Sequence, residues 1–423
     1  MKENMMHTPD GVKDYLPEDY RIKREVENRI EAVLNRRGYQ SMSPPTFEYI
    51  DVFSGIGSVD EGRIYKFIDR DGSVLALRSD ITPQISRIAA SNNWGGSYPL
   101  RFCYVANVYR YNESLQGKPN EFTQAGAEIY GACEGDADAE IIAAAINSLI
   151  CAGLADFRID IGHVEFLCGI LSETGLNETE LGEIQTNILK RDFVAVANAV
   201  KGREMPEGAK QILSDLALYI GDIHMLEKCA GIVTSEMAKN ALKKLTNVYE
   251  TLRQMKLDKY VLFDLSLTGN LDYYTGIIFK GYTYGAAFSI VDGGRYDKLS
   301  ENFGKKIESV GFAITINDLV TSLKESRVVF DLPVADTLAA YTEGGRETAF
   351  LCADALRGEG LYVENSLCGS DIEQNLKYAA EKNFSGMIYF ADGGKIMLYN
   401  LKTGEMAEVT LNNLLGGTKE EKL

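Results

Sequence analysis

The chain has 423 residues, of which 45% are hydrophobic and 25% charged, and 44 Lys and Arg against 61 Asp and Glu give a net charge of −17. At roughly 150 residues per domain this length predicts about three domains, and the apolar content is too high for a disordered chain. No run approaches the ~18 apolar residues of a membrane span, and the acidic balance gives no bulk attraction for nucleic acid.

Cysteine and histidine are too scattered to predict a metal or redox site. The seven cysteines include no Cys-x-x-Cys pair, which argues against a disulfide framework and a zinc cluster, and the three histidines lie far apart in the sequence. The N-terminus has no apolar segment typical of a secretory signal. We therefore expect reduced thiols, no metal and a cytoplasmic protein.

The first 168 residues are predicted to form a helix and antiparallel strands. Apolar residues recur at helical spacing near the N-terminus, and a long Ala-rich stretch follows two strand-like segments. The predicted elements are a helix over 17–38, a hairpin turning at Asp71-Gly72, strands over 101–111 and 122–130, and a buried helix over 136–151.

The rest of the chain is predicted to hold a helical insertion, the end of the first sheet and a separate domain. Residues 169–257 read as helices with stripes at 181–188, 213–220 and 241–252, and residues 258–328 return to strands over 261–265, 277–279 and 288–291. Residues 330–423 predict a small α/β domain with strand 335–341, helix 345–357, strand 360–364, helix 371–382 and strands 386–390 and 395–401. Runs of strands with helices to one side indicate the α+β class.

Two polar segments late in the chain are candidates for a binding site. Asp292-Gly-Gly-Arg-Tyr-Asp297 combines two glycines, which permit a tight turn, with Arg295, which can bind a carboxylate or phosphate. A strand-ending turn with a structural Arg–Asp pair is an equally good interpretation. Leu271-Asp-Tyr-Tyr-Thr-Gly276 places two tyrosines beside a carboxylate, although strand tyrosines are more often core and rim residues.

An earlier segment carries polar residues from a strand end into a helix. In Leu77-Arg-Ser-Asp-Ile-Thr-Pro-Gln84, the proline is suited to the first helical turn, so the helix is predicted to begin there. Asp80 and Thr82 lie just before it. Capping of this helix is the main alternative to ligand binding for both residues.

A polar pair is predicted on one face of the strand over 122–130. Gln124 and Glu128 are separated by an even number of residues, so both side chains lie on the same face. Polar side chains next to a buried helix need a partner, because burying them without hydrogen bonds is costly. The partner is either a bound polar ligand or solvent.

Together and in this order, these segments resemble the catalytic core of class II histidyl-tRNA synthetase over about residues 8–325. The matching segments are Thr8-Pro-Asp-Gly-Val-Lys-Asp-Tyr-Leu-Pro-Glu18 and Pro44-Pro-Thr-Phe-Glu48 (first motif), Tyr109-Arg110 to Glu121-Phe-Thr-Gln124 (second motif), Leu271-Asp-Tyr-Tyr274 (histidine-specific segment), and Gly293-Gly-Arg-Tyr-Asp297 with Val310-Gly-Phe-Ala-Ile314 (third motif). The resemblance implies an antiparallel synthetase-like sheet with flanking helices. It also implies that the C-terminal α/β domain resembles an anticodon-binding domain.

The resemblance implies a histidine-binding pocket whose first part holds the α-amino group. Asp80, shortened from the family's glutamate, and Thr82 match the residues that bind this group. Gln124 matches the glutamine that assists them.

The second part of the implied pocket recognises the imidazole and the carboxylate. Glu128 and Tyr274 match the imidazole-binding groups, which suits a ring that offers one donor and one acceptor when neutral. Arg110 matches an arginine able to bind a carboxylate with two hydrogen bonds. Tyr273 is expected to pack behind them, and Arg295 to support the pocket.

The chain departs from the synthetase where the family binds ATP. Gly269 stands where the family has the arginine that activates histidine, and Asn270 replaces a glycine. The third motif ends in Thr315-Ile-Asn-Asp318 instead of Gly-x-Glu-Arg, so an acid replaces an arginine that clamps the triphosphate. The arginine-rich loop of the second motif reads Asn112, Glu113, Lys118 and Asn120. Because cations stabilise the charge that develops in adenylyl transfer, these losses predict no adenylation.

What remains resembles the regulatory subunit of short-form ATP phosphoribosyltransferase. In that family a synthetase-like chain joins a small catalytic subunit for the first step of histidine biosynthesis. The resemblance implies no catalytic residue and no cofactor in this chain, a catalytic subunit as partner, L-histidine as effector, and a homodimer core within a hetero-oligomer. An active histidyl-tRNA synthetase and a degenerate synthetase-like binding module for another partner are the alternatives.

The C-terminal domain carries a large share of the acidic charge. Residues 330–423 hold 8 Lys and Arg against 15 Asp and Glu, a net charge of −7. The related synthetase domain approaches anticodon phosphates, so this balance argues against nucleic-acid binding. The domain is either a stabilising appendage or an interface for a partner.

Overall fold

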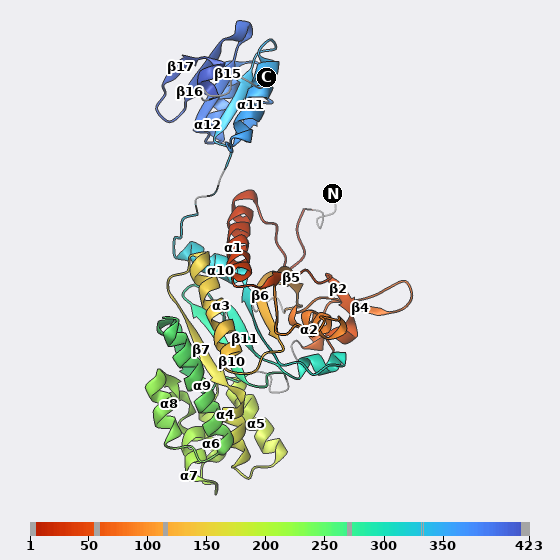
Figure 1. Cartoon of the computed structure of the whole chain (residues 1–423), viewed down its shortest axis with the longest axis vertical. Helices are drawn as coiled ribbons and strands as arrows, with labels where there is room; N and C mark the ends of the chain where they lie inside the picture. Colours follow the sequence, from red (N-terminus) through yellow and green to blue (C-terminus); the bar gives the residue numbers. More distant parts are fainter. Residues whose placement is uncertain are drawn as a thin grey trace. The chain divides into compact units, whose positions relative to one another are not determined.

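The computed structural model describes residues 6–54, 60–112, 117–268, 273–330, 332 and 334–415 (Figure 1). The chain divides into two compact units, Met1–Phe330 and Asp331–Leu423. Across the described ranges, no helix is both long enough and apolar enough to cross a bilayer.

A nine-stranded sheet organises the first unit. Its strands are β1 (Gln40–Ser41), β5 (Leu100–Tyr109), β6 (Glu121–Tyr130), β7 (Phe157–His163), β8 (Ile220–Gly221), β9 (Val261–Asp264), β10 (Ile277–Thr283), β11 (Val291–Arg295) and β12 (Ser309–Thr315). Their order is β1-β5-β6-β12-β11-β10-β7-β9-β8. The six strands from β5 to β7 in this order pair antiparallel, whereas β1 and β9 pair parallel with their inner neighbours. The predicted α+β class is confirmed.

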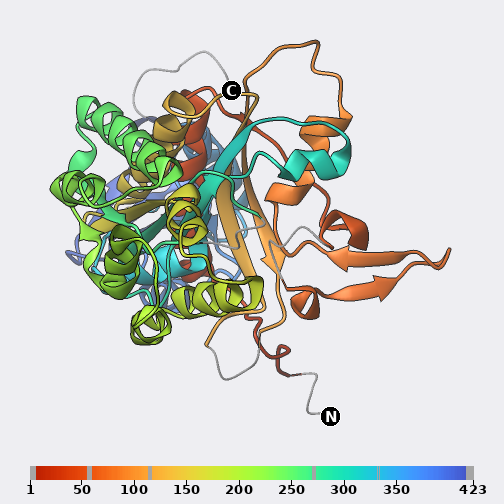
Figure 2. The same ribbon diagram turned by 90° about the horizontal axis from the view of Figure 1, so that it is seen from below.

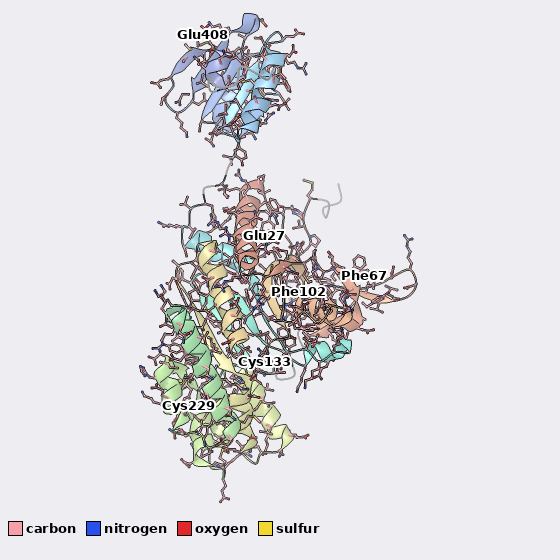
Figure 3. The ribbon with its side chains drawn as sticks, viewed as in Figure 1. Glu27, Phe67, Phe102, Cys133, Cys229 and Glu408 are labelled. Atoms are coloured by element: carbon pink, nitrogen blue, oxygen red, sulfur yellow. The ribbon has the colours of Figure 1, made fainter. Side chains whose placement is uncertain are left out.

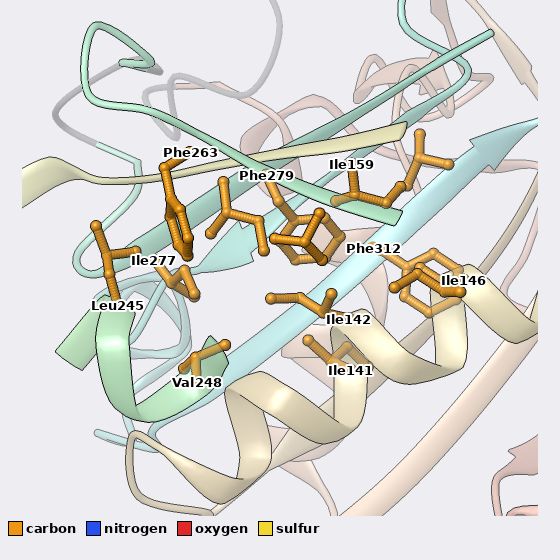
Figure 4. Packing of buried hydrophobic residues seen from close by; sticks show 14 of the residues in the cluster. Ile141, Ile142, Ile146, Ile159, Leu245, Val248, Phe263, Ile277, Phe279 and Phe312 are labelled. Carbon is orange, nitrogen blue, oxygen red and sulfur yellow. The ribbon is translucent and has the colours of Figure 1, made fainter. Parts of the chain in front are cut away.

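Helices cover one face of this sheet and bury the main core. They are α1 (Pro17–Arg36), α3 (Asp136–Ala152), α9 (Glu236–Gln254) and α10 (Ile316–Glu325). Figure 4 shows Ile141, Ile142 and Ile146 of α3 against Phe279 and Phe312 of the sheet, and all five are buried. Each such side chain contributes roughly 1.5–3 kcal/mol through burial. The predicted helices over 17–38 and 136–151 are confirmed to within two residues.

The opposite face of the sheet is less fully covered. Helix α2 (Thr82–Ser91) and the short 3-10 helix η7 (Leu299–Phe303) pack there over a second core. Phe102, Tyr104 and Tyr130 belong to this core and are nearly inaccessible to solvent. The candidate site lies beside it.

A small three-stranded sheet projects from the first unit, as the orange strands in Figure 2 show. It consists of β2 (Phe47–Tyr49), β3 (Lys66–Ile68) and β4 (Val74–Leu77), in the order β2-β4-β3. The predicted hairpin at Asp71-Gly72 is confirmed, and Gly72 has the positive φ of 90° that favours glycine in a tight turn. Phe67, labelled in Figure 3, is 41% exposed on this sheet.

A group of helices follows β7 in the chain and is drawn in yellow-green and green in Figure 1. Before α9 these are α4 (Val164–Ser172), α5 (Glu178–Leu189), α6 (Phe193–Val200), α7 (Glu207–Ser214) and α8 (Ile223–Ala230). The predicted helical stripe over 213–220 is wrong, because α7 ends at Ser214 and Ile220 pairs with Asp264 in the sheet. The pairing of β8 with β9 at the sheet edge therefore determines the structure at Ile220, although the apolar spacing there is helical.

The second unit is a five-stranded sheet between helices. Its elements are β13 (Thr337–Tyr341), α11 (Arg346–Gly358), β14 (Val363–Asn365), α12 (Ile372–Glu381), β15 (Gly386–Phe390), β16 (Ile396–Asn400), β17 (Met406–Val409) and α13 (Leu411–Leu414). The strand order is β14-β13-β15-β16-β17. Alternate residues of β13 face opposite cores, with Ala339 beside α11 and Leu338 beside α12. The six predicted elements are present within three residues at each end, whereas β17 and α13 were not predicted.

Candidate functional site

A cavity of about 320 Å³ opens on the less covered face of the nine-stranded sheet. Four neighbouring strands, β6, β12, β11 and β10, supply its floor, and the start of α2 supplies one wall. Its lining residues are Asp80, Thr82, Arg110, Gln124, Tyr273, Tyr274, Ile278, Lys280, Asp292, Gly293, Gly294, Tyr296, Gly311, Phe312, Ala313 and Thr315. Six of the eight predicted site residues are therefore brought together.

Strand register arranges the floor in rows that cross the sheet. The innermost row runs from Glu128 through Gly311 and Gly294 to Ile278. The next row runs from Gly126 through Ala313 and Asp292 to Lys280. Both rows point to the same face because the residues of successive rows are two apart on each strand.

Glycines at the centre of this floor make room for side chains from neighbouring elements. A Cβ atom at Gly311 would lie 1.6 Å from Oε2 of Glu128, and one at Gly294 would lie 2.7 Å from the ring of Tyr274. The prediction of a strand over 288–291 followed by a tight turn is wrong here, because β11 contains both glycines. They provide space for neighbouring side chains.

The wall formed by the start of α2 carries Asp80 and Thr82. Oδ1 of Asp80 accepts a hydrogen bond of 2.8 Å from the backbone N–H of Ile81, and burial raises the pKa of this carboxyl. The hydroxyl of Thr82 donates to Oε1 of Glu128 at 2.8 Å. Helix α2 begins at Thr82 itself, one residue before the predicted proline, and the Thr82 hydroxyl faces the cavity floor instead of capping the helix.

Gln124 reaches the cavity from β6, opposite Thr315 on β12. It is 6% exposed, and among the described residues its Oε1 has no hydrogen-bond partner. A buried acceptor without a partner costs about 1–3 kcal/mol. A ligand N–H group at this position would satisfy it.

Glu128 lies directly beneath the cavity and does not line it. It is fully buried, and its two carboxyl oxygens accept hydrogen bonds from Thr82 and from the hydroxyl of Tyr296. Burial raises the pKa of this carboxyl well above its ordinary value. Its carboxyl fills the space over Gly311 at the bottom of the cavity, and its predicted contact with an imidazole stays a prediction.

This raised pKa predicts a pH-dependent stability. The folded state holds a proton on Glu128 at pH values where the unfolded chain has lost it, so the free energy of unfolding falls as the pH rises above about 4.3. Glu128→Gln removes the ionisation. The stability of this variant relative to the wild type should rise with pH by up to about 1.4 kcal/mol per unit, as measured by urea unfolding between pH 5 and 8. If the free energies of unfolding of the two proteins changed in parallel with pH, the raised pKa of Glu128 would be contradicted.

Arg110 lies at the edge of the cavity. Its Nε donates to the backbone oxygen of Ser79 at 2.6 Å, and its guanidinium carbon lies 5.3 Å from the ring centroid of Phe122. Its Nη2 is 4.0 Å from Oδ1 of Asp80. The arginine is thus already held by the protein, and it brings positive charge to the cavity beside an acid.

Tyr273 and Tyr274 both line the cavity. Their rings meet edge to face with centroids 4.8 Å apart, and the ring of Tyr273 stacks on that of Tyr296 at 5.6 Å. Burial raises the pKa of both phenols, which keeps them neutral hydrogen-bonding groups. The preceding residues 269–272, which include Gly269 and Asn270, lie outside the described residues.

Arg295 is not a pocket residue, which corrects the expectation that it supports the pocket. Its side chain is fully buried and forms hydrogen bonds to Oδ1 of Asp138 at 2.7 and 2.9 Å and to Oδ1 of Asp297 at 3.1 Å. It therefore joins β11 to the first turn of α3 on the far side of the strand. The alternative interpretation of this motif, a structural Arg–Asp pair, is the correct one.

The sequence interpretation missed Lys280, Asp292 and Tyr296 as site residues. Asp292 and Tyr296 belong to the glycine motif that was noted, so the motif pointed to the site through residues other than its arginine. Lys280 gave no local signal, because it shares one face of its strand with the apolar Ile278. Its position becomes evident only from the pairing of β10 with β11.

A smaller cavity of about 140 Å³ adjoins the first, and the two share Arg110, Asp292 and Thr315. Arg63, Lys118 and Asp318 also line it. Burial raises the pKa of Asp318, as expected for an acid facing a cavity. Arg63, Arg110 and Lys118 nevertheless keep positive charge at this cavity, although the sequence had indicated a loss of positive charge. Glu113 of the same loop lies outside the described residues.

Asn317, which replaces the glutamate of the third motif, holds the start of α10 in place. Its Oδ1 accepts from the backbone N–H of Thr123 at 2.9 Å, and its Nδ2 donates to the hydroxyl of Tyr15 at 2.6 Å. This departure therefore has a structural role.

The site offers hydrogen-bonding and charged groups without metal ligands. Over the part of the chain that the structure describes, no group of three His, Cys, Asp or Glu side chains is placed to hold a metal ion. The seven cysteines are free thiols. An acid, an amide oxygen and hydroxyls on one side, with cations nearby, form a set of groups suited to a small zwitterion.

The sequence is similar to proteins of known families over nearly its whole length. Residues 11–319 match the model of the histidyl-tRNA synthetase family. An ATP phosphoribosyltransferase regulatory subunit from Acetivibrio thermocellus is 39% identical over 98% of this chain and 100% of that protein. One from Ruminiclostridium cellulolyticum is 36% identical over 97% of this chain and 98% of its own length.

Solved structures show the same fold. A crystal structure from Bacillus halodurans, described as an ATP phosphoribosyltransferase regulatory subunit/histidyl-tRNA synthetase, has a TM-score of 0.82 and 30% identity and covers 92% of this chain and 98% of that one. A histidyl-tRNA synthetase from Nostoc sp. has a TM-score of 0.81 over 96% of this chain and 97% of its own, at 21% identity. The latter shows the fold alone.

Proposed function

Because the chain belongs to the family of ATP phosphoribosyltransferase regulatory subunits, built on the histidyl-tRNA synthetase fold, we propose that it supports a separate short catalytic subunit and binds L-histidine as a feedback signal. Histidine biosynthesis is the process that this membership implies. The proposal makes the chain a non-catalytic cytoplasmic partner of that subunit.

The buried amide oxygen of Gln124 is the observation that carries the histidine proposal. In the described structure it lacks a hydrogen-bond donor, and Asp80 and Thr82 line the same cavity. An α-ammonium group would supply three N–H donors to this side of the cavity. An imidazole at the bottom of the cavity would then lie against the carboxyl of Glu128, which fills the space over Gly311, and beside the ring of Tyr274.

The absence of catalysis is proposed from the cations that adenylation requires. Gly269 replaces the arginine that the resemblance assigns to activation, and Asp318 adds an acid to the adjoining cavity. Transfer of an adenylyl group depends on cations that stabilise developing charge. These two departures together support a chain that binds histidine without activating it.

An active histidyl-tRNA synthetase is the second candidate, favoured by one observation. Arg63, Arg110 and Lys118 still surround the adjoining cavity, so an anion could be held there. Histidine-dependent exchange of pyrophosphate into ATP would establish this activity. Its absence, with histidine binding intact, supports the regulatory function.

Regulation requires that histidine bind two states of the complex unequally, because a ligand with equal affinity for both shifts nothing. Asp80 lies three residues after the end of β4 in the chain, and β4 belongs to the projecting three-stranded sheet. We therefore propose that ligand binding at Asp80 is linked to the position of this sheet, whose Phe47 and Tyr49 are more than half exposed.

A homodimer core within a hetero-oligomer is part of the same proposal. The exposed Phe47 lies in the first-motif segment and the exposed Tyr49 follows it directly, which supports a role for this segment in assembly. The acidic second unit is proposed as a remnant domain or a partner interface, without nucleic-acid binding.

Co-expression with a short catalytic subunit tests this function. We expect the two chains to elute together in size exclusion and to form phosphoribosyl-ATP from ATP and phosphoribosyl pyrophosphate, with inhibition by histidine. In the Thr82→Val variant the concentration of histidine for half inhibition should rise about tenfold or more. The reason is that the α-ammonium group of histidine loses the Thr82 hydroxyl as a hydrogen-bond acceptor. Assembly and uninhibited activity should be retained.

Thr186→Val, at an exposed position in α5, is the matched control and should leave inhibition unchanged. Failure of the two chains to associate would overturn the regulatory function. Capture of a different enzyme or translation factor from the native cell would instead favour a binding module for another partner.

A further inference from the structure

The outer row of the cavity floor holds a lysine that no motif identified. Among the described lining residues, the cations are Arg110 and Lys280. Arg110 already donates to the backbone of Ser79 and packs on Phe122. Lys280 projects from the other side of the cavity, on β10, and is 34% exposed.

The contact between Lys280 and its neighbour on β11 is loose. Its Nζ lies 3.4 Å from Oδ1 of Asp292, which is 48% exposed. This separation exceeds the 2.7–3.2 Å of a normal N–H···O hydrogen bond, and pairs at such exposure contribute little to stability. An ammonium group has three donors, so most of its bonding capacity is open to a ligand.

The depth of the two floor rows orients a ligand between them. Glu128, at the end of the inner row, is fully buried, whereas Asp292 and Lys280 in the outer row are partly exposed. A histidine whose ring lies over the inner row therefore has its α-groups at the outer row, near the mouth. Gln124 and Asp80, which carry acceptor groups, line the same cavity as Lys280.

The width of the floor suits a single amino acid. Lys280 and Gly126 stand at opposite ends of the outer row, three strand spacings or about 14 Å apart between Cα atoms. Lys280 lines the cavity on β10, and Gln124, two residues from Gly126 on β6, lines it on the other side. Between these ends the outer row carries Ala313 and Asp292, and the side chains of Glu128 and Tyr274 lie over the two glycines of the inner row.

We infer that Lys280 binds the carboxylate of the amino-acid ligand and makes the cavity selective for carboxylate-bearing imidazoles over imidazole amines. The inference rests on the proposed histidine site and extends it. With the α-ammonium group held by Asp80 and Gln124, the carboxylate exchanges with Asp292 as the partner of Lys280. Lysine thus supplies a cation on the cavity floor, in a chain where glycine stands at position 269.

Calorimetric titration of the full chain with L-histidine and with histamine, which lacks the carboxylate, tests this role. Lys280→Met should weaken L-histidine binding at least tenfold and change histamine binding less than twofold. Asp292→Asn, which removes the competing carboxylate, should keep or strengthen histidine binding. Lys228→Met, at an exposed position in α8, is the matched control and should bind both as the wild type does.

The outcomes separate the two proposals. Wild-type histidine affinity in Lys280→Met would overturn the lysine role alone, and so would equal weakening of both ligands. No histidine heat from the wild type at millimolar concentration would overturn the histidine site and this inference with it. If histamine binds to neither the wild type nor Lys280→Met, the melting temperature of the variant decides. A tenfold loss of histidine affinity with an unchanged melting temperature supports the inference. A lowered melting temperature that accounts for the loss overturns it.

Discussion

Replacing Arg295 with methionine is expected to lower the free energy of unfolding of the first unit by about 3–5 kcal/mol. The guanidinium is fully buried and forms two hydrogen bonds to Asp138, which is 4% exposed. Its removal leaves a buried carboxylate without its cation in the first turn of α3. The single tryptophan, Trp94, lies in this unit, so its fluorescence during urea unfolding provides the measurement.

Two further variants test the cause of this loss. Lys324→Met breaks an exposed ion pair with Asp19 and should cost no more than about 1 kcal/mol. Asp138→Asn in the Arg295→Met background removes the stranded charge and should restore part of the stability. A loss in Arg295→Met no larger than in Lys324→Met would show that the buried pair contributes little.

The main helices and strands were predictable because their patterns are strong and local. Helix α3 is formed by the Ala-rich apolar stretch itself, and β5 and β6 are long segments with a polar loop between them. Strand β7 also alternates, with Phe157, Ile159 and Ile161 buried, but it lies between two helical regions and was not predicted. Strand β17 is mostly exposed, so no apolar pattern marks it.

Site residues were predictable where a motif kept them close in sequence. How deeply each residue lies relative to the cavity was not predictable. Gln124 and Glu128 share one face of β6, as their spacing predicts. Only the pairing of β6 with β12 places Glu128 below the cavity, opposite Gly311. The paired glycines at 293–294 suggested a turn because a single sequence does not distinguish glycine required for positive φ from glycine required for space.

Gly311 provides the second large effect, and it links stability to the site. In Gly311→Ala the new Cβ would lie 1.6 Å from Oε2 of Glu128 and 2.6 Å from the hydroxyl oxygen of Tyr296. The Glu128 side chain must move and lose its hydrogen bonds to Tyr296 and Thr82. We expect a loss of about 1–3 kcal/mol in the free energy of unfolding, as for other overpacked cores.

The same variant should bind L-histidine at least a hundredfold more weakly, because the displaced carboxylate enters the space above the floor where the imidazole is proposed to bind. Gly182→Ala is the matched control, since this glycine lies in α5 with no atom within 4 Å of the added Cβ. It should stabilise the helix by about 0.5–1 kcal/mol and leave binding unchanged. Wild-type affinity in Gly311→Ala would mean that the floor at Gly311 does not contact the ligand, and the imidazole would have to bind elsewhere in the cavity.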